Sequence, residues 1–382
     1  MANNELMKAV IFDGPFKVSV QDRPVPTREC ASPMSSWQSL HFHLLRMFAG
    51  KCKTVVISSS KLQLQHCVAR WSELHVYRGH EPSEPGFIMG HEFTGIVTQT
   101  GEDVETVQIG DQVVVPFTAS CMNCFYCRNG WTSRCASSLP FGSPLLDGGQ
   151  AQYVRVPYAD GTVIKSPTGA PQETLVLMAD IFPTGFFGTK NAFKMLDGMD
   201  NSEATVVVIG CVPVGLCAII SALEYKPKHL FAIDGVESRL ELAMTLGAEP
   251  LNYVKDHDTM MQKIMDASEG RGADAVIEVV GLSKALRTAC DIIRPWGVIS
   301  SIGVHNAEIP WTGTEAYDKN LRIQMGRCPV RAVFKEALEV LTRNHQKLNF
   351  MFEKIMPLTE AVEAYEIFDK MKAQKVIFNP DE

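Results

Sequence analysis

The second half of the chain alternates short apolar runs with amphipathic stretches. From residue 205 onward, short runs of apolar and β-branched residues are separated by segments whose apolar positions recur at helical spacing. This alternation is typical of parallel strands joined by crossover helices, so we predict a doubly wound sheet. The expected strands are 205–209, 229–234, 275–280 and 298–302, and the expected helices include 238–246, which stops at Gly247, and 286–293, which is ended by Pro295.

The part before residue 180 is different, because Pro, Gly and stretches with a period of two replace the helical pattern. Stretches such as 112–116 and 152–156 favour strands separated by turns. We therefore expect an α/β protein in which a strand-rich lobe precedes the parallel sheet. We see no internal repeat and no low-complexity linker between the two parts.

Residues 28–71 depart from both patterns. From Cys30 to Ser72 there is no Asp or Glu, and Ser, His and Gln are abundant. One interpretation is a basic surface insertion. The other is sequence never selected to pack, such as a misread exon or a retained intron. We favour the second, because only 40–48 and 54–57 have a structure-forming pattern.

Length and charge narrow the class of protein. A chain of 382 residues fits two or three domains at about 150 residues each. The net charge of −7 gives no general electrostatic reason to bind nucleic acid or an anionic membrane. No apolar run approaches the length of a membrane span, and residues 1–10 do not resemble a secretion signal. We therefore expect a cytoplasmic protein with neither nucleic acid nor membrane as a partner.

Four cysteines follow the spacing CxxCxxCx7C, at Cys121, Cys124, Cys127 and Cys135. Short CxxC steps let successive sulfurs turn inward on one loop, so four thiolates can surround one tetrahedral ion. The pattern indicates a structural zinc site, although four unrelated reduced cysteines would have the same composition. A closed site with four sulfurs leaves no open position for a substrate, so the chemistry is expected elsewhere.

The turn after 205–209 has the features of a dinucleotide-binding site. Gly210 and Gly215 are the first and last glycines of a GxGxxG-like turn that opens an apolar helix, and Val212 replaces the middle glycine. Asp234, about twenty residues further on, is placed to accept from ribose hydroxyls and to repel a 2′-phosphate, which favours NAD over NADP. An ordinary strand-to-helix turn is the alternative.

A third motif connects these features. The sequence GHExxGxxxxxGxxV is complete and is carried by Gly90, His91, Glu92, Gly95, Gly101 and Val104. With the cysteines and the glycine turn, it resembles the zinc-dependent medium-chain alcohol dehydrogenases. The resemblance implies a GroES-like β-rich catalytic domain over residues 1–179, in which 28–71 are irregular. It also implies a Rossmann NAD-binding domain over 180–318 and a return to the catalytic domain over 319–382.

The resemblance also implies a catalytic zinc with an open position, which lowers the pKa of an alcohol hydroxyl. His91 and Asp180 match two of its three ligands, and Glu92 would lie beside the metal or join it. Arg70 stands where relatives carry the first ligand, a cysteine. A guanidinium has no lone pair to offer a cation, so the alternatives are Cys67 or Glu92 as the third ligand. Asp180 alone would be a plain loop carboxylate.

Further roles are implied by the same resemblance. Ser72 and His75 would form a proton relay, although Ser72 is also a good helix N-cap. Thr184 would pack on the nicotinamide. The cofactor-binding residues implied are Gly210, Val212, Pro213, Val214, Gly215, Asp234, Arg239, Gly303, Val304 and Arg327.

The function that follows is the interconversion of an alcohol and an aldehyde or ketone by hydride transfer to or from NAD. The partners expected are a small-molecule substrate and further copies of the chain in a dimer or tetramer. A zinc-free reductase of the same superfamily is an alternative, but such reductases lack the cysteines and the GHE motif. A second alternative is an impaired or silent homologue that keeps the structural zinc, since Arg70 and Val212 both depart from the family pattern.

Overall fold

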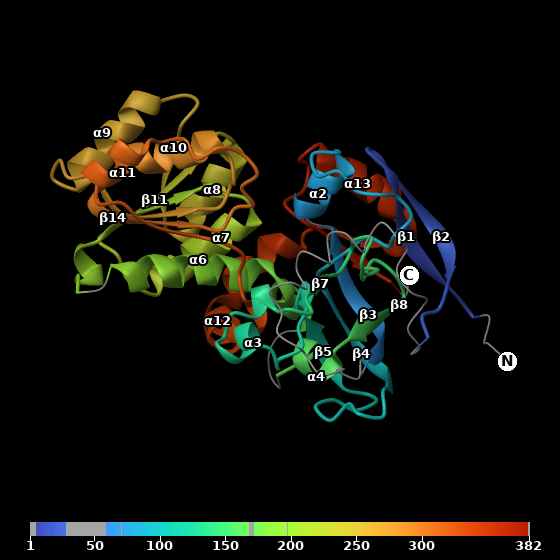
Figure 1. The fold of residues 1–382 in the computed structure, drawn as a ribbon. Helices are drawn as coiled ribbons and strands as arrows, with labels where there is room; N and C mark the ends of the chain where they lie inside the picture. Colours follow the sequence, from blue (N-terminus) through green and yellow to red (C-terminus); the bar gives the residue numbers. More distant parts are fainter. Residues whose placement is uncertain (1–4, 28–58, 70, 168–171, 197, 381–382) are drawn as a thin grey trace. The chain divides into compact units, whose positions relative to one another are not determined.

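The computed structural model describes residues 5–27, 59–69, 71–167, 172–196 and 198–380. They form two compact units (Figure 1). Unit 1 comprises Met1–Ala179 and Phe352–Glu382, and unit 2 comprises Asp180–Met351. The chain returns to unit 1 later than residue 319, the position that the sequence suggests. Residues 319–351 remain in unit 2 because a strand within them, Arg322–Met325, extends the parallel sheet.

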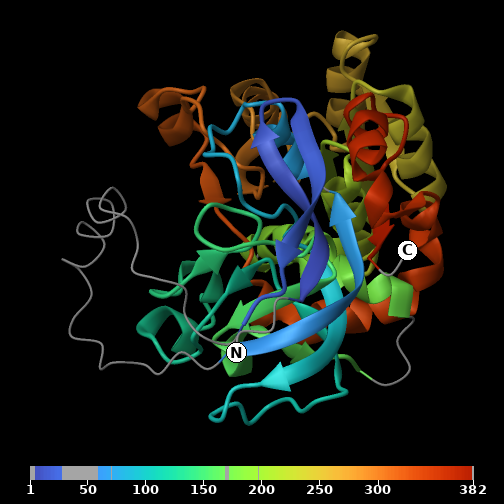
Figure 2. The same cartoon turned by 90° about the vertical axis from the view of Figure 1, so that its right-hand side faces the viewer.

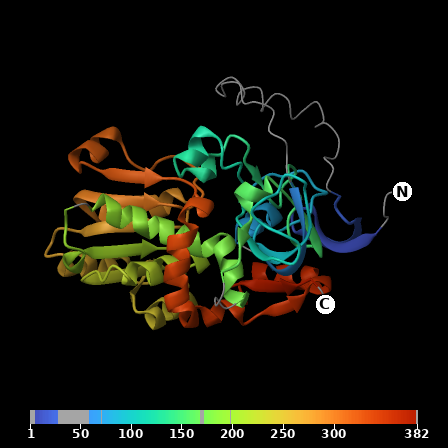
Figure 3. The same ribbon diagram turned by 90° about the horizontal axis from the view of Figure 1, so that it is seen from below.

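Unit 2 is built on a six-stranded parallel sheet with the order β12-β11-β10-β13-β14-β15. Its strands run side by side in one direction (Figure 3). They are β10 Thr205–Ile209, β11 His229–Asp234, β12 Glu249–Asn252, β13 Ala273–Glu278, β14 Ile293–Ser301 and β15 Arg322–Met325. The helices are α6 Ile181–Met195, α7 Pro213–Leu223, α8 Glu237–Leu246, α9 His257–Ala267, α10 Ser283–Ile292, α11 Gly313–Asp318 and α12 Val330–Asn344, with short 3-10 turns at η3 Asn201–Glu203 and η4 His345–Phe352.

Helices cover both faces of this sheet, as the predicted doubly wound fold requires. The helices α9 and α10 pack their apolar residues on one face, and α6 and α7 lie on the other (Figure 1). The strand order reverses between β10 and its neighbours β11 and β13. In open parallel sheets, ligands bind beyond the carboxyl ends of the strands at such a reversal. Gly210 directly follows β10 and therefore lies at this position.

Unit 1 contains a seven-stranded sheet with the order β16-β17-β3-β4-β5-β9, in which β8 also pairs with β3. A twisted antiparallel ribbon of β1 and β2 forms a second sheet (Figure 2). The strands are β1 Leu6–Gly14, β2 Lys17–Pro24, β3 Ser59–Ala69, β4 Phe93–Thr100, β5 Gln112–Val115, β6 Thr118–Ala119, β7 Leu139–Pro140, β8 Tyr153–Pro157, β9 Ile164–Lys165, β16 Ile355–Pro357 and β17 Val376–Asn379. The helices are α2 Trp71–Tyr77, α3 Phe125–Arg128, α4 Ala159–Thr162, α5 Gln172–Leu175 and α13 Ala361–Asp369, with 3-10 turns at η1 Thr132–Arg134, η2 Val176–Ala179 and η5 Leu358–Glu360.

The strand β3 corrects the prediction that residues 28–71 are irregular throughout. It pairs with β4, β8 and β17, and the side chains of Leu62, Leu64 and Cys67 are fully buried. The pairing with β4 has two register shifts, and the second places one extra residue, Gln65, in β3. Residues 28–58 and Arg70 lie outside the described residues.

Packing against β3 also explains a glycine of the GHE motif. A Cβ atom on Gly95 would lie 2.5 Å from the carbonyl oxygen of Gln63, so only glycine allows β4 to pair here.

None of the helices in the described part of the chain combines the length and apolar character that a bilayer-spanning helix needs.

Candidate functional site

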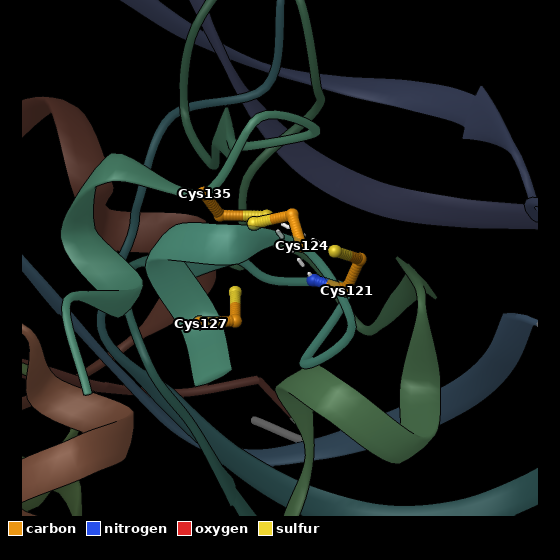
Figure 4. A group of neighbouring side chains, drawn as sticks. All are labelled: Cys121, Cys124, Cys127 and Cys135. Carbon is orange, nitrogen blue, oxygen red and sulfur yellow. Dashed lines mark hydrogen bonds between the residues drawn. The ribbon is translucent and has the colours of Figure 1, made fainter. Parts of the chain in front are cut away.

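The structure brings the four cysteines of the CxxCxxCx7C motif together (Figure 4). Their ligand atoms all lie within 4.8 Å of one another, and Cys127 is presented by the short helix α3. Backbone N–H groups point at the sulfurs: Cys121 N lies 3.3 Å from Cys135 Sγ, and Ala136 N lies 3.5 Å from Cys124 Sγ. N–H donors of this kind stabilise thiolates and orient them as ligands.

The pKa values of these thiols show why a cation fits. Burial raises the pKa of Cys124, but backbone N–H donors from Ala136 and Cys127 outweigh burial and lower the pKa to about 7. Burial raises the pKa of Cys135 to about 11, and burial together with the charge of Cys135 raises the pKa of Cys127. Four thiolates this close repel one another, and a dication offsets that repulsion. The donor set therefore fits zinc.

A second candidate site is organised around His91, which follows a tightly packed glycine in unit 1. Gly90 has a φ of +96°, and a Cβ atom there would lie 2.7 Å from the backbone nitrogen of Gln150. A Cβ atom on Gly148 would lie 2.1 Å from the carbonyl oxygen of Gly90. The two glycines therefore let the segment around Gln150 pack directly against the GHE motif.

Glu73 holds His91 in place. Its Oε1 atom accepts from the His91 backbone nitrogen at 3.0 Å and lies 3.1 Å from His91 Nδ1. The Glu73 side chain is 4% exposed and that of His91 is 12% exposed. An ionised carboxylate can only accept, so the contact favours the proton on Nδ1 and leaves the Nε2 lone pair for a metal. Sequence reasoning missed Glu73, although it lies between Ser72 and His75 in the run that was matched to the family.

Glu92 contacts a buried cation that the sequence did not reveal. Its Oε2 atom lies 2.6 Å from Lys375 Nζ, and the two side chains are 0% and 2% exposed. The two residues are 283 positions apart, so no local pattern joins them. Lys375 immediately precedes β17, the strand next to β3. The role of Glu92 beside a metal remains a prediction.

The predicted relay residues belong to helix α2. His75 is exposed, and partial burial followed by the charge of neighbouring His80 lowers its pKa below the ordinary value of 6.5. Ser72 lies in the first turn of α2, and its side chain lies outside the described residues. Cys67, the alternative ligand, is fully buried in β3. Burial and then the charge of Glu73 raise its thiol pKa well above the usual range, which keeps the thiol protonated.

Asp180 and Thr184 lie together at the start of α6 in unit 2. Asp180 is 4% exposed and occupies the position before the helix, where its Oδ1 atom accepts from the Thr184 hydroxyl. The environment of this carboxylate is thus more enclosed than that of a plain loop residue. His91 belongs to unit 1, so a metal site shared by His91 and Asp180 remains a prediction.

The predicted dinucleotide turn is tightly packed. Gly210 has a φ of +97°, and a Cβ atom on Gly215 would lie 1.8 Å from the Gly210 carbonyl oxygen. These values explain the first and last glycines of the motif. Val212 occupies the N-cap position of α7, and Pro213 follows as the first helical residue, where its missing N–H costs nothing. The turn therefore keeps its backbone form without the middle glycine.

Asp234 closes this turn at the end of β11. It is 7% exposed and accepts from the backbone nitrogens of Cys211 at 2.8 Å and Val236 at 2.9 Å. Arg239 Nη1 lies 3.7 Å from the same carboxylate. The carboxylate thus connects the glycine turn with α8, and it brings Arg239 into the predicted cofactor site.

The remaining predicted cofactor residues lie after β14 and β15. Gly303 packs so closely that a Cβ atom would lie 2.2 Å from the Gly281 nitrogen, and Val304 is 64% exposed. Arg327 is an exposed residue after β15. Sequence reasoning missed Glu278, a fully buried carboxylate that accepts from the nitrogens of Val280 and Gly281, both at 2.7 Å, and shapes the same loops.

Comparison with known proteins gives consistent matches over both units. Residues 61–168 match the model of the alcohol dehydrogenase GroES-like domain, and residues 213–343 match that of the zinc-binding dehydrogenases. The chain is 53% identical over 382 residues to "Zinc-type alcohol dehydrogenase B" of Aspergillus flavus, covering 100% of this chain and 83% of that protein. It is 50% identical over 313 residues to "Medium chain reductase/dehydrogenase ucsI" of Acremonium sp, covering 82% of this chain and 98% of that protein. The solved alcohol dehydrogenase TADH from Thermus sp. ATN1 is 29% identical with a TM-score of 0.83, covering 98% of this chain and 99% of that one.

Proposed function

The chain belongs to the zinc-binding medium-chain alcohol dehydrogenases, and from this premise we propose that it interconverts an alcohol and an aldehyde or ketone by hydride transfer to or from NAD. The observation that carries the proposal is the contact between His91 Nδ1 and Glu73 at 3.1 Å. A carboxylate on the far nitrogen is the usual arrangement of a metal-ligating histidine.

The residues proposed to hold the catalytic metal are His91 and Asp180, with Glu92 beside them. When bound, a zinc ion at such a site supplies a Lewis acid that lowers the pKa of an alcohol hydroxyl. Asp180 contributes a hard oxygen ligand, which zinc accepts together with imidazole nitrogen. Cys121, Cys124, Cys127 and Cys135 are proposed to hold a second, structural zinc.

The cofactor is proposed to bind at the carboxyl ends of β10 and β11. The first turn of α7 offers backbone N–H groups and the positive end of the helix dipole to a pyrophosphate. Asp234 is proposed to accept from the ribose hydroxyls, and its charge disfavours a 2′-phosphate, so NAD is favoured over NADP. Gly303 and Val304 would present backbone to the nicotinamide carboxamide, and Arg327 would pair with the pyrophosphate.

Ser72, His75 and Thr184 complete the proposed mechanism. Thr184 would pack on the nicotinamide from the first turn of α6. Ser72 would accept the proton of the substrate hydroxyl, and His75 would pass it to solvent from the exposed side of α2. The substrate is then a small alcohol or carbonyl compound. Assembly into dimers or tetramers and a cytoplasmic location remain predictions.

Replacing His75 with glutamine is expected to slow alcohol oxidation at neutral pH by roughly 10²-fold, as loss of a general base does. Only neutral His75 accepts a proton, and its lowered pKa keeps it neutral at neutral pH. The rate of the unaltered protein should therefore fall as the pH drops below 6.5, through that lowered pKa, and the variant should lack this acid limb. Because His80 lowers the pKa of His75, His80→Gln should move the limb to higher pH. An unchanged pH–rate profile in the His75→Gln variant would remove His75 from the mechanism.

The function itself is tested by metal content and turnover measured on the same sample. We expect two zinc ions per chain and formation of NADH from a panel of primary and secondary alcohols. His91→Gln should lose one zinc and all turnover while keeping the other zinc. When zinc is limiting, Arg70→Cys should raise occupancy of the catalytic site and activity, because it supplies the thiolate that relatives carry. One zinc per chain and no turnover of any alcohol would support a silent homologue instead.

A further inference from the structure

A chain of buried hydrogen bonds continues from Glu73 into the core of unit 1. Gln150 Nε2 lies 3.1 Å from Glu73 Oε2 and 2.9 Å from the Val68 carbonyl oxygen. The hydroxyl of Tyr365 donates to Gln150 Oε1 at 3.0 Å. Gln150 and Tyr365 are both 0% exposed. A polar chain of this kind is costly unless each of its groups is paired, so its presence next to the GHE motif calls for a reason.

The chemistry of the partners fixes which way the Gln150 amide points. Val68 contributes a carbonyl and Glu73 a carboxylate, and each of these groups only accepts. The NH₂ end of the amide must therefore face them, and its oxygen must face Tyr365. An inverted amide would place oxygen against oxygen twice. Tyr365 therefore donates to Gln150, and Gln150 donates to Glu73.

The backbone of Gln150 is fixed as well. Its nitrogen donates to the Met89 carbonyl at 2.8 Å, and its carbonyl accepts from Val10 N at 2.8 Å. Because Met89 lies two residues before His91, the amide and the histidine are held on the same short stretch of structure. Glu73 spans them, with Oε2 on Gln150 and Oε1 on His91.

We propose that Gln150 and Tyr365 are positioning residues for the catalytic metal site, acting on His91 through Glu73. Together they hold the plane of the Glu73 carboxylate so that Oε1 accepts from His91 Nδ1. That contact keeps the proton on Nδ1 and the lone pair on Nε2. The inference deepens the proposed function and rests on it in one respect, since it takes His91 as a zinc ligand.

Tyr365 comes from the C-terminal segment of unit 1. Tyr365 lies in α13, within the segment Phe352–Glu382 that returns to unit 1 after unit 2 is complete. The C-terminal segment therefore contributes to the geometry of a motif 274 residues earlier, counted as 365 − 91. Zinc binding at His91 is accordingly expected to depend on the docking of this segment.

The test compares Gln150→Met and Tyr365→Phe with the unaltered chain. Gln150→Met keeps the length of the side chain and removes its donors, and Tyr365→Phe removes a single hydroxyl. The control is Tyr77→Phe, which removes a hydroxyl from a buried ring that packs 5.2 Å from the Tyr365 ring. Each full-length protein is labelled with ¹⁵N-histidine, and the His91 resonance is assigned by its loss in His91→Gln. Zinc affinity is measured by competition with a chelator, and folding by the unfolding midpoint.

The expected result is a single Nδ1–H tautomer of His91 in the unaltered chain and in Tyr77→Phe. In Gln150→Met we expect a mixture of His91 tautomers. We also expect the zinc affinity of the site at His91 to be lower by roughly 10–100-fold, the usual cost of losing an outer partner of a metal ligand. Tyr365→Phe should change both in the same direction by less, and it decides the matter if Gln150→Met does not fold. Unchanged tautomer and affinity in folded variants would overturn the inference. If His91→Gln loses no zinc, the proposed function fails, and the tautomer alone still tests the positioning roles.

Discussion

Replacing Lys375 with methionine is expected to lower the free energy of unfolding of unit 1 by about 3–5 kcal/mol. The Lys375 ammonium and the Glu92 carboxylate lie 2.6 Å apart with 2% and 0% of their side chains exposed. Removing one partner of a buried ion pair leaves the other charge in the core, where water does not solvate it. The measurement is the urea dependence of unfolding, followed by a signal from unit 1.

Three further variants separate this effect from loss of packing. Lys375→Arg keeps the charge and should retain much of the stability. Glu92→Gln combined with Lys375→Met removes the unpaired charge and should recover part of the loss. Lys8→Met, in an ion pair with Asp22 whose side chains are 46% and 54% exposed, should change stability little, because water screens exposed pairs. If Lys375→Met were as mild as Lys8→Met, the buried pair would contribute nothing to the stability of unit 1.

Four strands of unit 2 are predicted because the central strands β10, β11, β13 and the end of β14 are buried and mainly apolar. The edge strands β12 and β15 are partly exposed and contain polar residues, so the sequence does not predict them. The ranges expected for β10 and β11 agree with the structure residue for residue. The strand β14 begins earlier than predicted, because Pro295 does not end a helix but lies inside the strand next to Trp296, which has a φ of +61°. The composition of 30–72 hides β3, because polar and apolar residues alternate only over 61–65 before the extra residue Gln65 shifts the pairing with β4.

The candidate site also combines residues that are close in sequence with residues that only the fold brings together. Motifs such as the four cysteines and the glycine turn are recognisable because their members are close in sequence, and the structure brings them together in space. The partners that orient His91 and Glu92 come from positions that only the completed sheet makes adjacent. Gln150, Tyr365 and Lys375 therefore carry no sequence signal, because chain topology rather than spacing places them.

The second large effect is expected at the cysteine cluster. Cys127→Ser should abolish zinc binding there under mild chelation, a larger loss than the roughly 10–100-fold that removal of an outer partner causes. Cys127 is a buried member of the cluster, and a serine hydroxyl stays protonated where a thiol ionises. Since a structural zinc contributes folding energy directly, the loop that carries the cysteines should open with the metal gone. Zinc content per chain after dialysis gives the first measurement.

Limited proteolysis supplies the second measurement, because the loop contains exposed aromatic residues at which a protease can cut. Phe125, Tyr126 and Trp131 are 61%, 44% and 52% exposed, yet their backbone is fixed by the turns around α3. Chymotrypsin cleaves after aromatic residues, so it should cut the Cys127→Ser variant here and leave the zinc-loaded chain intact. Cys290→Ser, which alters a buried cysteine of unit 2, should keep the zinc and the resistance. If Cys127→Ser had the same zinc content and the same cleavage pattern as Cys290→Ser, the four thiols would not hold a metal. Loss of a ligand in the cluster would then have no more effect than loss of a cysteine outside it.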